Sequence, residues 1–156
     1  MQHELFLKQA IQEAYKGFRN RDGGPFGALI VRDGTILGKG HNTVLKSSDP
    51  TAHAEVNAIR NACAKLRNHH LTGSVIYTNF EPCPMCLSAI YWADIRTVFY
   101  SAGKEIAEKI GFMDGKLYRE MALPMESRET KLSMIELPEM NLLLKDWEGM
   151  EGKILY

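Results

Sequence analysis

The fold of this chain is decided around the stretch Glu81-Pro82-Cys83-Pro84-Met85-Cys86. A β-rich run from Ser74 to Thr78 precedes it, and a largely apolar run follows it as far as Trp92. Because proline is tolerated only in the first turn of a helix, Pro82 and Pro84 mark the entry to a helix that continues to about Trp92. The sequence therefore predicts a buried strand, a short loop and a helix, with both cysteines at the start of the helix.

Helices and strands alternate on both sides of this stretch. Apolar residues at three- and four-residue spacings predict an amphipathic helix from Glu4 to Phe18. Two β-rich runs around an Asp-Gly turn predict a hairpin from Ala28 to Leu37. A helix is expected from about Ala52 to Leu66, after a loop that offers an N-cap, and another buried strand from Thr97 to Tyr100. This alternation favours an α/β fold in which helices cover both faces of a mixed sheet.

The pattern becomes weaker beyond Gly103. We expect short helices near Ile106 and from Lys116 to Met121, a strand from Leu132 to Glu136, and a helix from Met140 to Trp147. The remaining tail has no pattern that favours a helix or a strand.

Length and charge limit the classes of function. A chain of 156 residues fits one domain with a sizeable core. Lys plus Arg and Asp plus Glu both number 19, whereas proteins that grip a nucleic-acid backbone usually carry a basic excess. No signal peptide and no apolar stretch long enough to cross a bilayer are visible. We therefore expect a cytoplasmic protein without a nucleic-acid or membrane partner.

Three residues have the spacing and the chemistry of metal ligands. The chain has three cysteines, and the spacing of Cys83 and Cys86 suits a metal site in a reducing compartment better than a disulfide framework. Residues i and i+3 share one face of a helix, whose positive N-terminal end favours thiolates. With a neutral imidazole from His53, two thiolates would neutralise one Zn²⁺ per chain and leave one tetrahedral position open, as in catalytic zinc sites.

Glu55 is the candidate proton carrier. It follows His53 by two residues, about 200° around an ideal helix, so it can lie beside a metal-activated water without being a ligand. A carboxylate there can accept the proton of the water and deliver it to a leaving amine. Cys-x-x-Cys alone also fits a redox pair or half of a structural zinc site. For that alternative the candidate fourth ligands are Cys63, His41, His69 and His70.

The combination of His-x-Glu with Pro-Cys-x-x-Cys resembles the signature of the cytidine-deaminase-like superfamily, which assigns the metal to His53, Cys83 and Cys86 and proton transfer to Glu55. The resemblance extends to the small bacterial guanine deaminases over residues 23–28, 41–42, 49–55, 81–86 and 89–93. It implies an α/β/α sandwich around a five-stranded mixed sheet. It also implies a homodimer of single deaminase domains, residues 1–156, in which about residues 121–156 can exchange between subunits.

The same resemblance implies hydrolysis of guanine to xanthine and ammonia. Guanine presents N1–H and its 2-amino group as donors, and Asp114 matches the family position of a carboxylate that accepts them, although Asp114-Gly115 also fits a turn. Asn42 offers a donor and an acceptor to a purine edge, or is a turn residue after a strand. Phe26 and Trp92 either sandwich the ring or fill the core.

The tail leaves base selectivity open. Tyr156, the last residue, resembles a family tyrosine that closes the site, although a terminal residue usually frays. Met113 stands where the family pattern has a second acidic residue, and residues 121–154 align poorly. Guanosine, cytosine and aminotriazine deaminases therefore remain alternatives, as does a tRNA adenosine deaminase, which the neutral charge disfavours. A zinc-stabilised binding module is the non-enzymatic alternative; Glu55 argues against it, because a structural site does not use a carboxylate beside a water.

Overall fold

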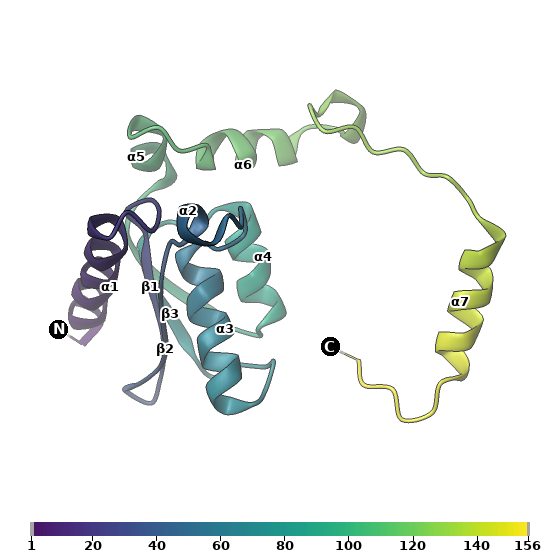
Figure 1. Cartoon of the computed structure of the whole chain (residues 1–156), viewed down its shortest axis with the longest axis horizontal. Helices are drawn as coiled ribbons and strands as arrows, with labels where there is room; N and C mark the ends of the chain where they lie inside the picture. The colour runs from purple at the N-terminus through teal and green to yellow at the C-terminus, as the bar shows by residue number, and fades with distance from the viewer. Residues whose placement is uncertain (1, 156) are drawn as a thin grey trace. The chain divides into compact units, whose positions relative to one another are not determined.

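Four strands form one mixed sheet with the order β2-β1-β3-β4 in the computed structural model, which describes residues 2–155 (Figure 1). The strands are β1 (Gly27–Arg32), β2 (Thr35–His41), β3 (Val75–Phe80) and β4 (Thr97–Ala102). β1 is antiparallel to β2 and to β3, whereas β3 and β4 are parallel. The predicted α/β class and the mixed sheet are confirmed.

The β1–β2 hairpin turns at the predicted Asp-Gly pair. Asp33 and Gly34 have φ values of 51° and 74°, so both residues lie in the left-handed region that a two-residue turn of type I′ requires. Ile30 pairs with Gly38 but Val31 pairs with Ile36, so the ladder contains a bulge. The turn and the ladder together place the start of β1 beside the end of β2, with Gly27 opposite His41.

Helices cover both faces of the sheet. Figure 1 shows α1 (Gln2–Arg19) on one side of the strands and α3 (Ala54–Leu66) with α4 (Pro84–Trp92) on the other. The α1 side is a cluster of large buried side chains: Phe6, Leu29, Val31 and Tyr77. The opposite side packs the small residues of α3 against the sheet: Ala54, Ala58 and Ala62 meet Ala28, Ile30 and Ile76. Alternating side chains of β1 thus face two separate cores.

The remaining helices are short, and they divide between two units. The N-terminal unit ends at Arg119 and the C-terminal unit begins at Glu120. The helices are α2 (Val44–Ser47), α5 (Lys104–Lys109), α6 (Asp114–Ala122), a 3₁₀ turn (Met125–Ser127) and α7 (Pro138–Gly149). The helices expected near Ile106, over 116–121 and over 140–147 correspond to α5, α6 and α7, whereas α2 was not predicted. Among residues 2–155, no helix combines the length and the apolar character that crossing a bilayer requires.

The fifth strand predicted from the sequence does not form among the described residues. Residues 132–136 form no strand, so the sheet has four strands, not five, in the part of the chain that the structure describes. These residues are all exposed, and they have no neighbouring strand to which their backbone groups can bond. Their alternating apolar side chains show a capacity to pair, but a strand forms only beside a partner.

Gly27→Ala tests the close packing of α1 against β1. A Cβ at Gly27 would overlap the backbone oxygen of Ala10 and lie 2.5 Å from the backbone nitrogen of Ala14. Because both are backbone atoms, α1 must shift, and we expect the free energy of unfolding to fall by about 1–3 kcal/mol in urea titrations. The control is Gly149→Ala, where a Cβ meets nothing within 4 Å. Equal stability of both variants would contradict this packing.

Candidate metal centre and active site

The strand register gathers the functional segments at one end of the sheet. Gly27 at the start of β1 lies opposite His41 at the end of β2, Ala28 lies opposite Thr78 near the end of β3, and Phe80 is opposite Ala102. Residues just before β1 and just after β2, β3 and β4 therefore meet at the same edge. This edge receives Phe26, Asn42 and the Glu81–Cys83 loop.

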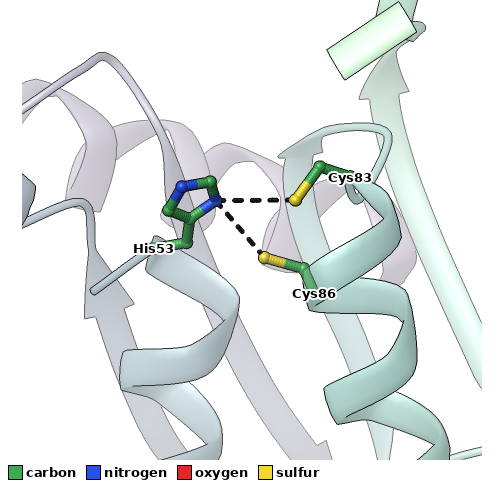
Figure 2. Close-up of side chains that lie close together, drawn as sticks. All are labelled: His53, Cys83 and Cys86. Carbon is green, nitrogen blue, oxygen red and sulfur yellow. Dashed lines mark hydrogen bonds between the residues drawn. The ribbon is translucent and has the colours of Figure 1, made fainter. Parts of the chain in front are cut away.

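Two helix starts bring three metal-ligand atoms together, as Figure 2 shows. His53 is the N-cap of α3, Cys83 is the N-cap of α4, and Cys86 lies in the first turn of α4. Nδ1 of His53 is 3.6 Å from Sγ of Cys83 and 3.5 Å from Sγ of Cys86. Within residues 2–155, these three form the one cluster of His, Cys, Asp or Glu whose ligand atoms all lie within 4.8 Å.

The cluster has the dimensions of a zinc site. Zinc binds thiolate sulfur at about 2.3 Å and imidazole nitrogen at about 2.0–2.1 Å, so tetrahedral geometry separates the two ligand atoms by about 3.6 Å. The two observed separations, 3.6 and 3.5 Å, match this value. One neutral imidazole and two thiolates are also the soft, charge-balancing donors that zinc prefers.

The four alternative ligands lie in other contacts. His41 is hydrogen-bonded through Nε2 to Oδ2 of Asp22 at 2.8 Å. Cys63 Sγ contacts the backbone oxygen of His69 at 3.8 Å, and the His69 and His70 rings lie 4.2 Å apart. None of the four belongs to the cluster among the described residues. Three protein ligands leave a fourth position for water or substrate, which is typical of a catalytic zinc site.

Contacts within the ligand cluster shift the pKa values of its members. A hydrogen bond from Cys86 lowers the pKa of the Cys83 thiol to about 4. The same bond raises the pKa of Cys86, and the hydrogen bond to Cys83 raises the pKa of His53. The low pKa of Cys83 favours the thiolate that zinc requires. Metal binding must displace the remaining protons, which is the usual coupling between a thiolate site and pH.

Glu55 touches the ligand set without belonging to it. Its side chain is buried in the first turn of α3, with 4% of its surface exposed. The hydroxyl of Thr78 donates to Oε1 at 3.4 Å, and the thiol of Cys86 donates to Oε2 at 3.4 Å. Burial is the main cause that raises the pKa of Glu55. A carboxylate in this environment can both accept and donate a proton.

A cavity of about 390 Å³ opens beside Glu55. It contains five of the residues predicted from the sequence besides Glu55: Phe26, Asn42, His53, Cys83 and Asp114. The structure thus brings both ring-stacking and hydrogen-bonding candidates to the metal ligands. Burial raises the pKa of Asp114, as expected for a carboxyl group that partly faces the interior.

Phe26 and Asn42 are held by backbone contacts. Asn79 accepts the backbone N–H of Gly27 and donates to the oxygen of Pro25, at 2.9 and 2.8 Å, so it fixes the chain on both sides of Phe26. Oδ1 of Asn42 accepts the backbone N–H of Val44 at 3.1 Å. The turn role and the cavity position of Asn42 therefore coexist, and its amide nitrogen is the group that offers donors to a ligand.

One predicted residue, Trp92, does not join this cavity. Trp92 is the last residue of α4, whereas Cys83 and Cys86 lie at its start, so a nine-residue helix of about 13 Å separates them. Its side chain is 65% exposed and does not line the cavity. The alternative that Trp92 fills the core is therefore wrong, and its contact with the ring stays a prediction. Tyr156 lies outside the described residues.

The sequence reasoning gave no role to two residues that the structure places beside this site. Phe112 lines the cavity and meets Phe26 edge to face, with ring centres 4.6 Å apart and planes at 87°. Its sequence signal is its place two residues before Asp114. Thr78, fully buried on β3, holds Glu55, and it carried no signal beyond its place in a predicted strand.

Comparisons with known proteins agree with this geometry. The family model described as the cytidine and deoxycytidylate deaminase zinc-binding region matches residues 1–102. The guanine deaminase of Bacillus subtilis (strain 168) is 46% identical over the full length of both chains. A tRNA-specific adenosine deaminase of Aquifex aeolicus (strain VF5) is 44% identical over 65% of this chain and 67% of its own.

A solved structure matches the whole fold. The X-ray structure of guanine deaminase from Bacillus subtilis has a TM-score of 0.94 and covers 100% of this chain and 99% of its own, at 46% identity. The likeness to the tRNA deaminase stops after about two thirds of the chain, whereas the likeness to this structure continues to the C-terminal unit. From the matched zinc-binding region, which contains all three ligands and Glu55, this chain belongs to the cytidine and deoxycytidylate deaminase family of zinc-binding enzymes.

Proposed function

We propose that this enzyme hydrolyses guanine to xanthine and ammonia. The observation that carries the proposal is that Glu55 contacts the ligand Cys86 and also lines a cavity that contains Asp114. The likeness to a guanine deaminase along the full chain supports guanine over other bases. The likeness to tRNA deaminases covers less of the chain, and a formal net charge of zero favours a small base over a nucleic acid.

Glu55 is the proposed proton carrier. When bound to His53, Cys83 and Cys86, zinc supplies a Lewis acid that lowers the pKa of water to about 7. A carboxylate oxygen of Glu55 accepts the proton of the attacking water and then donates it to the departing amine. The hydroxyl of Thr78 donates to one carboxylate oxygen, so the side chain keeps its place while its protonation changes.

The proposed base-binding residues surround the same cavity. Asp114 would accept the N–H groups of the base, and the amide nitrogen of Asn42 would donate to a ring nitrogen or carbonyl oxygen. Phe26 and Phe112, which meet edge to face, would form the apolar wall against the ring. Guanosine, cytosine and aminotriazines share parts of this hydrogen-bonding edge and remain the alternative substrates.

We also propose a reducing, cytoplasmic location. All three cysteines are free, and two of them are the metal ligands. A disulfide between Cys83 and Cys86 would remove both thiolates from the metal. A compartment that keeps thiols reduced is therefore the one in which this site can hold zinc.

The C-terminal unit is the proposed dimerisation segment. Every apolar side chain of α7 is exposed within the chain, with Leu142 64%, Leu143 60% and Trp147 43% exposed. Such a helix is stable only when another surface covers it. We propose that residues 121–156 of this deaminase domain pack on a second copy, and that Tyr156 closes the site of one subunit.

Cys83→Ala is expected to lose zinc. With one ligand removed, zinc per chain should fall from about one to below about 0.1, and the thermal midpoint should fall with it, because binding energy at such a site is also folding energy. Cys63→Ala is the matched control, since Cys63 lies outside the ligand cluster. The measurement is inductively coupled plasma mass spectrometry of purified protein. Full zinc content in Cys83→Ala would rule out this ligand set.

Glu55→Gln is expected to keep zinc and lose turnover. The amide cannot accept a proton, so kcat for ammonia release from guanine should fall about 10²- to 10⁴-fold. Glu4→Gln, at an exposed position on α1, should leave kcat unchanged. Wild-type enzyme is assayed beside both variants on guanine, guanosine, cytosine, adenine and ammeline. Near-normal kcat in Glu55→Gln would overturn its role, and preference for another base would overturn guanine.

Mixed dimers test the exchange of the C-terminal segment. Glu55→Gln and a truncation that lacks the last few residues are each expected to be inactive. If each tail serves the partner subunit, random exchange in an equal mixture makes about half of the dimers crossed. Each crossed dimer has one intact site out of two, so about one quarter of wild-type activity returns. The assay is ammonia release after exchange, with mixing confirmed by native mass spectrometry. Inactive mixtures with confirmed exchange would show that each tail serves its own chain.

A further inference from the structure

The segment from Gly103 to Arg119 carries two cavity residues without belonging to the sheet. Phe112 and Asp114 line the cavity from the link between α5 and α6, and both are half-buried. Both lie beyond residue 102, where the match to the family's zinc-binding region ends. The position of this link relative to His53 and Cys83 therefore decides where the base-binding wall stands.

Polar contacts join this segment to the loop that delivers Cys83. Oε2 of Glu81 accepts the backbone N–H of Lys104 at 3.1 Å, and the ammonium of Lys104 donates to Oε1 and Oε2 at 3.1 and 3.3 Å. The hydroxyl of Tyr118 donates to the backbone oxygen of Pro82 at 2.7 Å. The ammonium of Lys104 also lies 5.3 Å from the centre of the Tyr118 ring. We call these four residues the loop clamp.

The loop clamp holds both ends of the stretch that contains the cavity residues. Lys104 is the first residue of α5, and Tyr118 lies in the middle of α6. Arg119 of α6 pairs with both carboxylate oxygens of Glu108 of α5, at 2.6 and 3.3 Å. The two short helices are therefore also joined to each other. On the other side of the clamp, Pro82 directly precedes the ligand Cys83.

We propose that Lys104 and Tyr118 are positioning residues that set the affinity for the base. Through Glu81 and Pro82, they hold Phe112 and Asp114 at the working distance from the metal ligands. The inference rests on the proposed function, because the base is the ligand whose affinity is measured. Thr78, which is not part of the clamp, donates to Glu55, so loss of the clamp weakens binding much more than proton transfer.

Tyr118→Phe and Lys104→Met test the proposal by kinetics. In both variants we expect KM for guanine to rise about 10-fold while kcat stays within about twofold, which is the pattern of lost binding without lost chemistry. Zinc content should stay at the wild-type level. Asp114→Ala gives the reference rise in KM, and Lys104→Arg should restore most of the affinity. Tyr15→Phe, which removes a hydroxyl from a half-exposed tyrosine on α1, is the matched control.

Hydrogen exchange gives a second readout that needs no substrate. Peptides that cover residues 104–118 should exchange faster in Tyr118→Phe and in Lys104→Met, with peptides of β1 unchanged. If wild-type enzyme does not hydrolyse guanine, the proposed function is wrong. Hydrogen exchange still tests the loop clamp in that case, and KM is then measured with the base that the enzyme accepts. Wild-type KM and exchange in both variants would overturn the proposal. Parallel losses of zinc and kcat would also overturn it, because they indicate a general structural role.

Discussion

The site depends on the register of the four strands. Because Gly27 pairs with His41, Ala28 with Thr78 and Phe80 with Ala102, one end of the sheet receives the chain on four separate passes. Each pass leaves a different kind of group at this end. An aromatic ring precedes β1, an amide follows β2, a thiolate loop follows β3, and the segment that carries a carboxyl group follows β4. A shift of one residue in any ladder would turn these groups away from each other.

The N-termini of α3 and α4 stabilise the negative charges of the site. α3 and α4 both begin at a metal ligand, and the free backbone N–H groups of a first turn stabilise negative charge. Two sulfurs and the carboxylate of Glu55 therefore gather where the backbone is positive, although all three groups are buried. Burying such a cluster costs free energy unless a cation balances its charge. The small alanines of α3 let the helix approach the sheet closely enough to enclose the cluster.

The sequence predicted the parts of this design that depend on local spacing. Apart from α2, the helices and strands from Glu4 to Tyr100 were predicted correctly, as was the three-ligand cluster, because turn residues, prolines and short motifs determine them within a few positions. The sequence did not show that Trp92 is exposed rather than part of the core, because α4 carries it to the end of the helix far from the cysteines. The fifth strand was misplaced because its backbone has no partner among the described strands. The place of Phe112 two residues before Asp114 was its only sequence signal, since its contact with Phe26 joins distant parts of the chain.

The break between residue 102 and the α5–α6 segment has an evolutionary consequence. The zinc ligands and the proton carrier lie inside the matched region, whereas Phe112 and Asp114 lie beyond it. The proton carrier and the proposed base-binding residues Phe26 and Asn42 thus lie in one stretch of the chain, and the rest of the proposed base-binding wall lies in the next. Insertions or recombination after β4 can alter which amine is accepted while the inherited chemistry stays intact. A lineage can in this way explore new substrates without passing through an inactive ancestor.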